Sequence, residues 1–474
     1  MKKKEFFLFS LCAVVVLFLS GCNKGDDDSF SNIYGNLVEY ERINKFIIDG
    51  VQTFYLWEAE TDWKQYDRRE VYAQYKDHDE LFYQLRSKED KWSYLTDDIK
   101  GLENEFAGIS TTFGYSLSFY RLSSVSNEVI AVVLFTSPDS PAENAGIKRG
   151  DIIVEMNGGK ITTSNYANLY YSASLQLQCG VWDMDTKTIE TLPEVKNLTA
   201  VTMYEDPINT YNVIEKSGHK IGYLCYTAYQ EKSERELIRI FSEFKAAGVK
   251  DVVLDLRYNP GGYARTSLLL GSILAPENYV KNKSVFLEHH YNALYTAYLT
   301  QNKYPLNDFF LDTLSVNMNL NRLYVLTGKN TASASEATIV GLEPYLKLVQ
   351  IGDTTSGKYC GGVLLSPENF YDEKNYYSNF VNWGMYIMIY RFANIKGISS
   401  FTGGLAPNIL EIEDEFDLKP FGDENDPLLR WALADISGEQ YIEKRSKPLP
   451  LPFIALPDLK RPVDGRMIDR INNE

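Results

Sequence analysis

Histidine and cysteine are scarce in this chain, and basic residues are outnumbered by acidic ones. Its 474 residues include four His and five Cys, with 48 Lys and Arg against 64 Asp and Glu. So few histidines argue against a metal site built from several imidazoles, and they limit Ser-His catalysis. His289 and His290 are adjacent, so they point to opposite faces of a strand and are expected to be structural or surface residues. The net charge of −16 argues against nucleic acid binding, because phosphates are neutralised by clustered Lys and Arg.

Cysteine usage leaves little room for cross-links. Cys12 and Cys22 belong to the extreme N-terminal segment, which leaves Cys179, Cys225 and Cys360 for the body of the chain. Three cysteines allow at most one disulfide, and their spacing fits no zinc pattern. Cys225 falls in an apolar stretch and is expected to be a buried thiol.

Long apolar runs are absent except at the N-terminus. Residues 6–19 form an apolar run behind three consecutive Lys, which is too short for a comfortable membrane span and typical of a signal peptide over residues 1–21. The run ends in LSGC, which resembles a bacterial lipobox. That resemblance implies that Cys22 is acylated and anchors the protein to a membrane of the bacterial cell envelope, on the periplasmic side or the outer surface. The alternative is a plain signal peptide or a short anchor.

The composition is that of a globular protein, with 44% hydrophobic and 24% charged residues, and the length suggests about three domains. Residues 22–31 contain three consecutive Asp and are expected to form an acidic tether. Residues 32–105 are expected to form an N-terminal helical domain. Helical spacing over residues 36–58 and apolar, aromatic content over 70–85 and 91–95 support this interpretation.

Residues 106–205 change to short strands and turns. Strands are expected at residues 118–120 and 129–136, followed by SPDSPAENAG and IKRGDIIVEMNG. This order resembles the PDZ domains of bacterial proteases. In that family a loop before the second strand binds the carboxylate of a chain terminus, and the matching stretch here is Phe113, Gly114, Tyr115, Ser116 and Leu117. The alternative is a PDZ-shaped domain that only docks on its neighbour.

Residues 206–438 alternate strands and helices, which predicts a largely parallel sheet covered by helices. Within this region, residues 276–320 are expected to be an irregular insertion. A late helix is expected at residues 426–438, and residues 439–474 are expected to form a proline-rich surface tail.

Three segments in this region lie where a strand ends and a helix or loop begins, which is where open α/β sheets place their ligands. They are DLRYNPGG at residues 255–262, TASASE at 331–336 and GDTTSGK at 352–358. Ser333 would lie at a helix N-terminus, where the dipole favours developing negative charge. The N–H groups of Gly261 and Gly262 would help to form an oxyanion hole. Lys358, if desolvated, could accept a proton from the serine.

Together these segments resemble the S41 serine peptidases, the C-terminal processing or tail-specific protease family, in which the lysine follows the nucleophile by 25 positions, as Lys358 follows Ser333. The resemblance implies an α/β core of the crotonase and ClpP type, with Ser333 as nucleophile and Lys358 as general base. It also implies that Ala334 N–H and one of the two glycine N–H groups form the oxyanion hole. The family often has a Gln four positions after the Lys, where this chain has Gly362. Ser335 or Thr355 is considered as the third group instead.

The expected function is that of a serine endopeptidase of the cell envelope that forms an acyl-enzyme and needs no cofactor. Its substrates would be polypeptides with exposed C-termini, selected by the PDZ-like domain. The alternative is a non-catalytic peptide-binding lipoprotein that keeps the protease scaffold. Residues 331–336 could also be only a capped helix start. The P-loop-like spacing of GDTTSGK lacks the following Ser or Thr, which disfavours nucleotide binding. Asp255 and Arg257 are expected to be structural.

Overall fold

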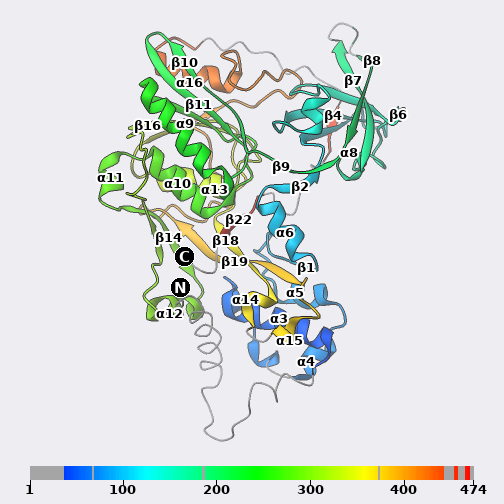
Figure 1. Ribbon diagram of the computed structural model, residues 1–474, viewed down its shortest axis with the longest axis vertical. Helices are drawn as coiled ribbons and strands as arrows, with labels where there is room; N and C mark the ends of the chain where they lie inside the picture. Colours follow the sequence, from blue (N-terminus) through cyan, green and yellow to red (C-terminus); the bar gives the residue numbers. More distant parts are fainter. Residues whose placement is uncertain are drawn as a thin grey trace, which may run out of the picture.

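The structure is a computed structural model that describes residues 37–66, 69–183, 186, 188–371, 374–441, 453–456, 459 and 465–469. The predicted signal peptide, the acidic tether and Cys22 lie outside these residues. No helix in the described part of the chain is both long and apolar enough to cross a bilayer. Figure 1 shows a parallel-sheet region beside a separate β domain, with a group of short helices below them.

The parallel sheet predicted for residues 206–438 is confirmed. It has the order β10-β11-β12-β16-β17-β20, in which only β10 runs antiparallel to its neighbour. The strands are β10 (Ile208–Lys216), β11 (His219–Tyr226), β12 (Asp251–Asp255), β16 (Arg322–Thr327), β17 (Lys347–Gly352) and β20 (Ile409–Leu410).

Helices cover both faces of this sheet, because alternate strand residues belong to two separate cores. Leu224 and Leu254 belong to the core of α9 (Glu234–Ala247), α10 (Ala264–Leu274) and α13 (Ala334–Leu342). Tyr223 and Val253, one position earlier on the same strands, pack instead with α16 (Pro427–Ser437). This burial on both faces explains why the strands read as continuous apolar runs.

A second sheet lies beside the first. It pairs strands that are distant in the sequence, so the local hydrophobic pattern does not indicate which strands are neighbours. Its central strand β19 (Gly384–Ala393) pairs with β18 (Cys360–Leu365), β14 (Val285–Tyr291) and β1 (Tyr94–Thr96), and β15 (Asn307–Phe309) extends the edge. The prediction of an irregular insertion at 276–320 is therefore wrong, since this segment forms α11 (Glu277–Lys281), β14, α12 (Ala293–Gln301) and β15. The helical expectation for residues 91–95 also fails, because pairing with β19 makes residues 94–96 a strand.

The N-terminal helices pack on this second sheet and share its hydrophobic core. They are α3 (Glu39–Phe54), α4 (Arg69–Gln74), α5 (His78–Leu85) and α6 (Ile99–Phe106). Phe46 of α3 contacts the rings of Phe370 and Phe380, which flank the short helices α14 (Pro367–Phe370) and α15 (Lys374–Tyr377). The helical region is thus joined to the core through one continuous apolar interior.

The β domain has a core of its own, formed by alternate strand residues. Its elements are β2 (Ile109–Thr112), β3 (Tyr115–Arg121), β4 (Val129–Thr136), α7 (Pro141–Asn144), β5 (Ile152–Met156), β6 (Gly159–Lys160), α8 (Asn168–Tyr171), β7 (Ser174–Asp183), β8 (Thr188–Thr199) and β9 (Val201–Tyr204). Ser140 caps α7 by accepting from Glu143 N–H, and Pro141 starts the helix.

The prediction of a surface tail at residues 439–474 is wrong for two of its described parts, residues 454–455 and 467–469, which form strands. β21 (Ile454–Ala455) pairs with β3 of the β domain. β22 (Met467–Asp469) lies between β13 (Gly262–Tyr263) and β18, parallel to both. Met467 and Ile468 are buried, because β22 is covered by a strand on each side.

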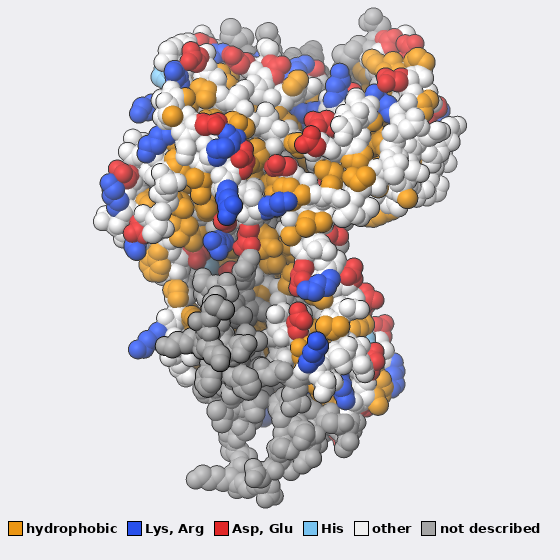
Figure 2. All heavy atoms as spheres, in the orientation of Figure 1, with side chains coloured by type: hydrophobic (Ala, Val, Ile, Leu, Met, Phe, Trp, Pro, Cys, Tyr) orange, Lys and Arg blue, Asp and Glu red, His pale blue; other side chains and the backbone are white. Residues whose placement is uncertain are grey.

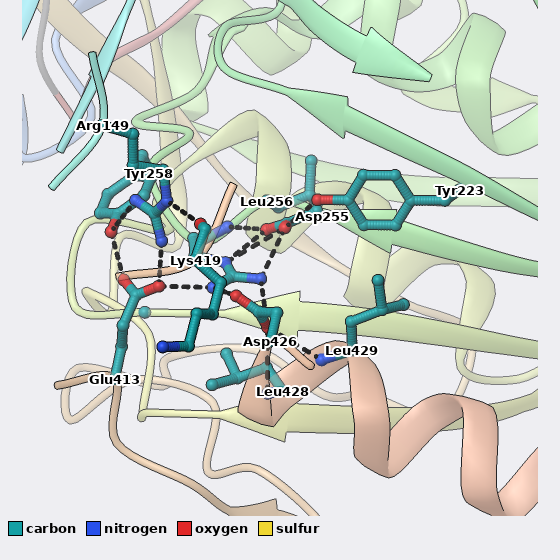
Figure 3. Close-up of polar contacts among 12 residues, drawn as sticks. Arg149, Tyr223, Asp255, Leu256, Tyr258, Glu413, Lys419, Asp426, Leu428 and Leu429 are labelled. Atoms are coloured by element: carbon teal, nitrogen blue, oxygen red, sulfur yellow. Dashed lines mark hydrogen bonds and ion pairs between the residues drawn. The ribbon is translucent and has the colours of Figure 1, made fainter. Parts of the chain in front are cut away.

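A buried ion-pair network connects the end of β12 with α16 and with the β domain (Figure 3). Arg257 lies 2.8 Å from Asp255, 2.8 Å from Asp426 and 2.5 Å from Glu413. Asp426 also caps α16 through the N–H groups of its first turn. Arg149 of the β domain pairs with the same Glu413 and donates to Tyr258 OH. Arg257 is therefore structural, as expected.

Replacing Arg257 with Met should lower the free energy of unfolding by about 3–5 kcal/mol, because three acidic side chains would lose a buried guanidinium partner. Chemical denaturation measures this change. Arg239→Met serves as the control, since it removes an arginine from an exposed ion-pair cluster on α9, and its unfolding midpoint should not move. Equal midpoints for wild type and the Arg257 variant would contradict a stabilising role of the network.

Candidate active site

Two of the three sequence segments, residues 255–262 and 331–336, meet at Asn259. Its backbone carbonyl accepts from Ala332 N–H at 3.1 Å and from Ser335 Oγ at 3.1 Å. Its side-chain carbonyl accepts from Gly261 N–H at 2.9 Å. The loop after β12 and the start of α13 are thereby fixed to each other, so Ser333 lies beside the two glycines.

Ser333 has a strained backbone and an unpartnered hydroxyl. Its φ of 63° and ψ of −112° are rarely adopted by a residue with a side chain, and such strain costs about 1–3 kcal/mol. The residue is fully buried, and its Oγ has no hydrogen-bond partner among the described residues. The capped-helix interpretation accounts for Glu336, which accepts from Ser333 N–H, but it assigns no partner to the hydroxyl.

The two glycines differ in what their N–H groups do. A Cβ on Gly261 would lie 2.7 Å from Ser333 Cβ, so only glycine allows this close approach. Gly261 N–H is already bonded to Asn259. Tyr229 pairs with the backbone of Gly261 and Tyr263, so Gly262 N–H faces the opposite side, where β22 lies. Ala334 N–H belongs to the first turn of α13 and has no acceptor within the helix. Ala334 and Gly262 are thus the better-placed pair of donors.

Lys358 is fully buried, and its ammonium group contacts two aromatic rings, those of Trp92 and Tyr386, at 5.8 and 5.3 Å. Burial lowers the pKa of Lys358, and with the nearby positive charge of Arg466 the pKa falls to about 7. Neutral amine is therefore available near pH 7, so Lys358 can act as a proton acceptor.

Tyr386 is the residue that sequence reasoning missed. Lys358 Nζ lies 3.0 Å from Tyr386 OH, and that hydroxyl donates its only hydrogen to Met467 O at 2.5 Å. The hydroxyl can therefore only accept from Lys358, which fixes the amine while leaving its lone pair free. A Cβ at Gly362 would lie 2.9 Å from Tyr386 Cζ, so the tyrosine ring fills the space beside that glycine.

Glu336 joins the serine segment to the lysine segment. Its two carboxylate oxygens accept from Thr355 Oγ1 at 2.6 Å, Gly357 N–H at 2.7 Å, Ser333 N–H at 2.8 Å and Lys358 N–H at 2.9 Å. Burial raises the pKa of Glu336, and these four bonds oppose that rise.

Neither Ser335 nor Thr355 meets the expectation for a third group beside Lys358. Ser335 Oγ donates to the Asn259 carbonyl. Thr355 Oγ1 donates to Glu336 and accepts from Leu405 N–H. Both hydroxyls therefore hold backbone segments in place rather than contacting the amine.

The predicted carboxylate-binding stretch lies at the start of β3. Gly114 has a positive φ of 77°, and its N–H donates to Thr112 Oγ1 at 2.9 Å. Phe113 is buried against Tyr115. A cavity of about 150 Å³ is lined by Tyr115, Ser116 and Leu117 on one side. Its other lining residues include Pro260, Ala332 and Ser356, so it connects the β domain with the candidate active site.

The remaining candidates lie elsewhere. His289 is buried and contacts Asp308 and Tyr291 through its ring nitrogens, while His290 is exposed. Cys179, Cys225 and Cys360 are free, buried thiols, which confirms the expectation for Cys225. Over the residues that the structure describes, no cluster of three or more His, Cys, Asp or Glu is arranged to hold a metal ion.

Two protein-family models match parts of the chain. The Peptidase S41 N-terminal domain matches residues 42–94, and Peptidase family S41 matches residues 220–410. Together the two matches span just over half of the chain. The chain therefore belongs to peptidase family S41.

Two characterised relatives and one solved structure are similar to this chain. A carboxyl-terminal-processing protease of Picosynechococcus is 27% identical over 49% of this chain and 51% of its own length. The carboxy-terminal processing protease CtpB of Bacillus subtilis is 25% identical over 54% of this chain and 48% of its own length. The chain thus spans about half the length of the curated relatives it matches. A structure of an S41 protease from Bacteroides fragilis has a TM-score of 0.66, is 24% identical, and covers 83% of this chain and 97% of its own. The chain accordingly has the S41 protease fold.

Replacing Glu336 with Gln should lower the free energy of unfolding by about 1–3 kcal/mol, because the amide NH2 would face backbone donors that now bond to an oxygen. Thermal or chemical denaturation measures the change. Glu368→Gln, on the exposed surface, is the matched control and should leave stability unaltered. An unchanged Glu336 variant would show that the carboxylate does not hold the two segments together.

Proposed function

We propose that this protein is a serine endopeptidase in which Ser333 is the nucleophile and Lys358 the general base. The observation that carries the proposal is the fully buried lysine with a pKa of about 7. Glu336 bonds to the backbone N–H groups of both Lys358 and Ser333, whose backbone is strained and whose hydroxyl is unpartnered. A lysine that is partly neutral and held in this way can accept the proton of the serine hydroxyl. A lysine of purely structural function would more commonly be charged and paired with a carboxylate.

The reaction follows from these positions. Lys358 accepts the proton of Ser333 as Oγ bonds to the scissile carbonyl carbon, and Ala334 and Gly262 N–H groups stabilise the oxyanion. The tetrahedral intermediate collapses, the C–N bond breaks, and the leaving amine takes the proton from Lys358. Water then attacks the acyl-enzyme and gives its proton to Lys358, which returns it to Ser333 as the carboxylic acid product leaves. No step needs a metal or an organic cofactor.

The proposal also covers how the enzyme selects its substrates and where in the cell it is held. The exposed C-terminus of a polypeptide is the proposed occupant of the cavity lined by Ser116, Leu117 and Ala332. The β domain would act as a PDZ-like selector of these termini. Cys22 would carry the lipid that anchors the enzyme in the cell envelope. On the face in Figure 2, basic and acidic side chains are interspersed, which suits a polypeptide substrate better than a nucleic acid. The alternative of a non-catalytic scaffold rested on the missing Gln, and Tyr386 supplies Lys358 with a partner in its absence.

Hydrolysis of an unfolded protein such as casein tests the chemistry directly. Ser333→Ala should abolish turnover, and so should Lys358→Met and Lys358→Arg, because guanidinium does not lose its proton in proteins. Neutral Lys358 is the reactive form, so the wild-type kcat should rise as pH increases through about 7 and level off above it. Lys358→Met should unfold at the same or higher denaturant concentration, since it removes a buried ionisable group. A fully active Lys358→Arg enzyme would overturn the assignment of the base.

Tyr386→Phe separates positioning from simple packing, because it removes one hydroxyl and keeps the ring. We expect kcat to fall about 10-fold or more with KM unchanged, as is typical when a hydrogen bond to a charged group is lost. The pH at which kcat rises should also move below 7. The Tyr386 hydroxyl accepts more strongly from ammonium than from neutral amine, so its loss lowers the pKa of Lys358. Tyr390→Phe on the same strand is the control, because its buried hydroxyl has no partner among the described residues. Equal pH profiles for the two variants would assign Tyr386 a packing role only.

A further inference from the structure

The candidate nucleophile cannot be reached in the described conformation. Ser333 and Lys358 are both 0% exposed, and a polypeptide substrate must place a carbonyl carbon against Ser333 Oγ. Some covering segment therefore has to move before any peptide bond can be cut. The position of β22 indicates which segment that is.

β22 lies in the place that an extended substrate would need. On one side Met467 pairs with Gly262 and Ile468 with Tyr263. On the other side Ile468 pairs with Gly362, on the strand that follows Lys358. Gly262 N–H, the candidate oxyanion donor, faces this strand, and Met467 O accepts from Tyr386 OH. The backbone of the chain itself thus occupies the groups proposed to receive substrate.

β21 occupies the edge of the β domain in the same manner. Its pairing with β3 is antiparallel, and Leu456 N–H donates to Phe119 O at 2.8 Å. Leu456 and Leu459 pack against the hydrophobic core of the β domain. Addition of a strand to an exposed sheet edge, with apolar side chains in pockets, is a general mode of peptide recognition.

The two contacts lie along one path. The cavity of about 150 Å³ that joins the β domain to the active-site loops is lined by Leu459 and Gly465 as well as by Leu117 and Ala332. The described residues of this part of the chain therefore contact the β3 edge, the connecting cavity and the backbone of Gly262, in sequence order. Pairing at both ends is short, since β21 has two residues and β22 three, so displacement breaks few backbone bonds.

We propose that residues 453–456, 459 and 465–469 are internal occupants of the substrate path, and that an extended, apolar polypeptide enters by displacing them from β3 and from β13 and β18. The inference rests on the proposed endopeptidase function and adds the surface that the substrate uses. A substrate strand in place of β22 would offer its own carbonyl to Tyr386. Departure of Arg466 would also remove a positive charge from the neighbourhood of Lys358.

A disulfide between positions 120 and 455 tests this by locking the segment onto β3. Leu456 and Phe119 share a backbone bond, so the neighbouring pair Ala455 and Tyr120 is a non-hydrogen-bonded pair, whose Cα separation suits a disulfide. In the full chain carrying Tyr120→Cys and Ala455→Cys, oxidation should lower the casein cleavage rate at least about 10-fold, and reduction should restore it. Ala455→Cys alone should not respond to the oxidant.

A release variant gives the opposite signal. Leu456→Asp puts a charge against the core of the β domain, so it should weaken docking of the segment and raise kcat/KM severalfold. Leu410→Asp, at an exposed position, is the control and should leave kcat/KM unchanged. If the oxidised cross-linked protein cuts casein as fast as the reduced one, the inference is wrong while the endopeptidase stands. If no form of the protein cuts casein and Ser333→Ala makes no difference, the proposed function itself fails, and the inference with it.

Discussion

The buried carboxylate of Glu336 is the interaction on which the candidate site depends. Ser333 and Lys358 belong to segments that follow different strands, and neither segment has regular structure where the two residues lie. Glu336 accepts one backbone N–H from each of them and two further donors from the same loop as Lys358. A carboxylate fully satisfied in a low-dielectric interior holds its donors in one geometry, because losing any of them leaves a buried charge under-compensated.

The chemistry of Lys358 comes from regions that are remote in the sequence. Trp92 from the N-terminal region, Tyr386 from β19 and Arg466 from the segment before β22 all lie around its amine. The first two lower the polarity of its surroundings, and the third adds a like charge. In the described conformation, the helical region and the residues just before β22 are therefore part of the environment that lowers the pKa of the amine, although the motifs that contain Ser333 and Lys358 lie elsewhere in the sequence.

The sequence predicted what is local and missed what depends on distant pairing. Outside residues 276–320, the alternation of strands and helices from residue 219 to 352 was predicted, because continuous apolar runs and helix caps are encoded nearby. The motifs grouped Ser333, Lys358, Ala334 and the glycines, and in the structure Gly261 lies against Ser333 while Glu336 bonds to the N–H groups of Ser333 and Lys358. β19 and β22 were missed, since their partners are set by register across the second sheet. Tyr386 was missed for the same reason: it pairs with Leu364 on the neighbouring strand and its ring reaches Gly362 and Lys358, and no spacing rule marks it.

The shared use of Glu413 restricts how the molecule can admit a substrate. Arg149 holds the β domain to the same carboxylate that partly neutralises Arg257, so a swinging motion of this domain would unbalance charges at the end of β12. Burial makes such an imbalance expensive. We therefore expect the β domain to stay docked on the parallel-sheet region during turnover. The short strands β21 and β22 would move instead of whole domains. In the proposed endopeptidase the frame would have no hinge between domains, and the gate would be a piece of its own main chain.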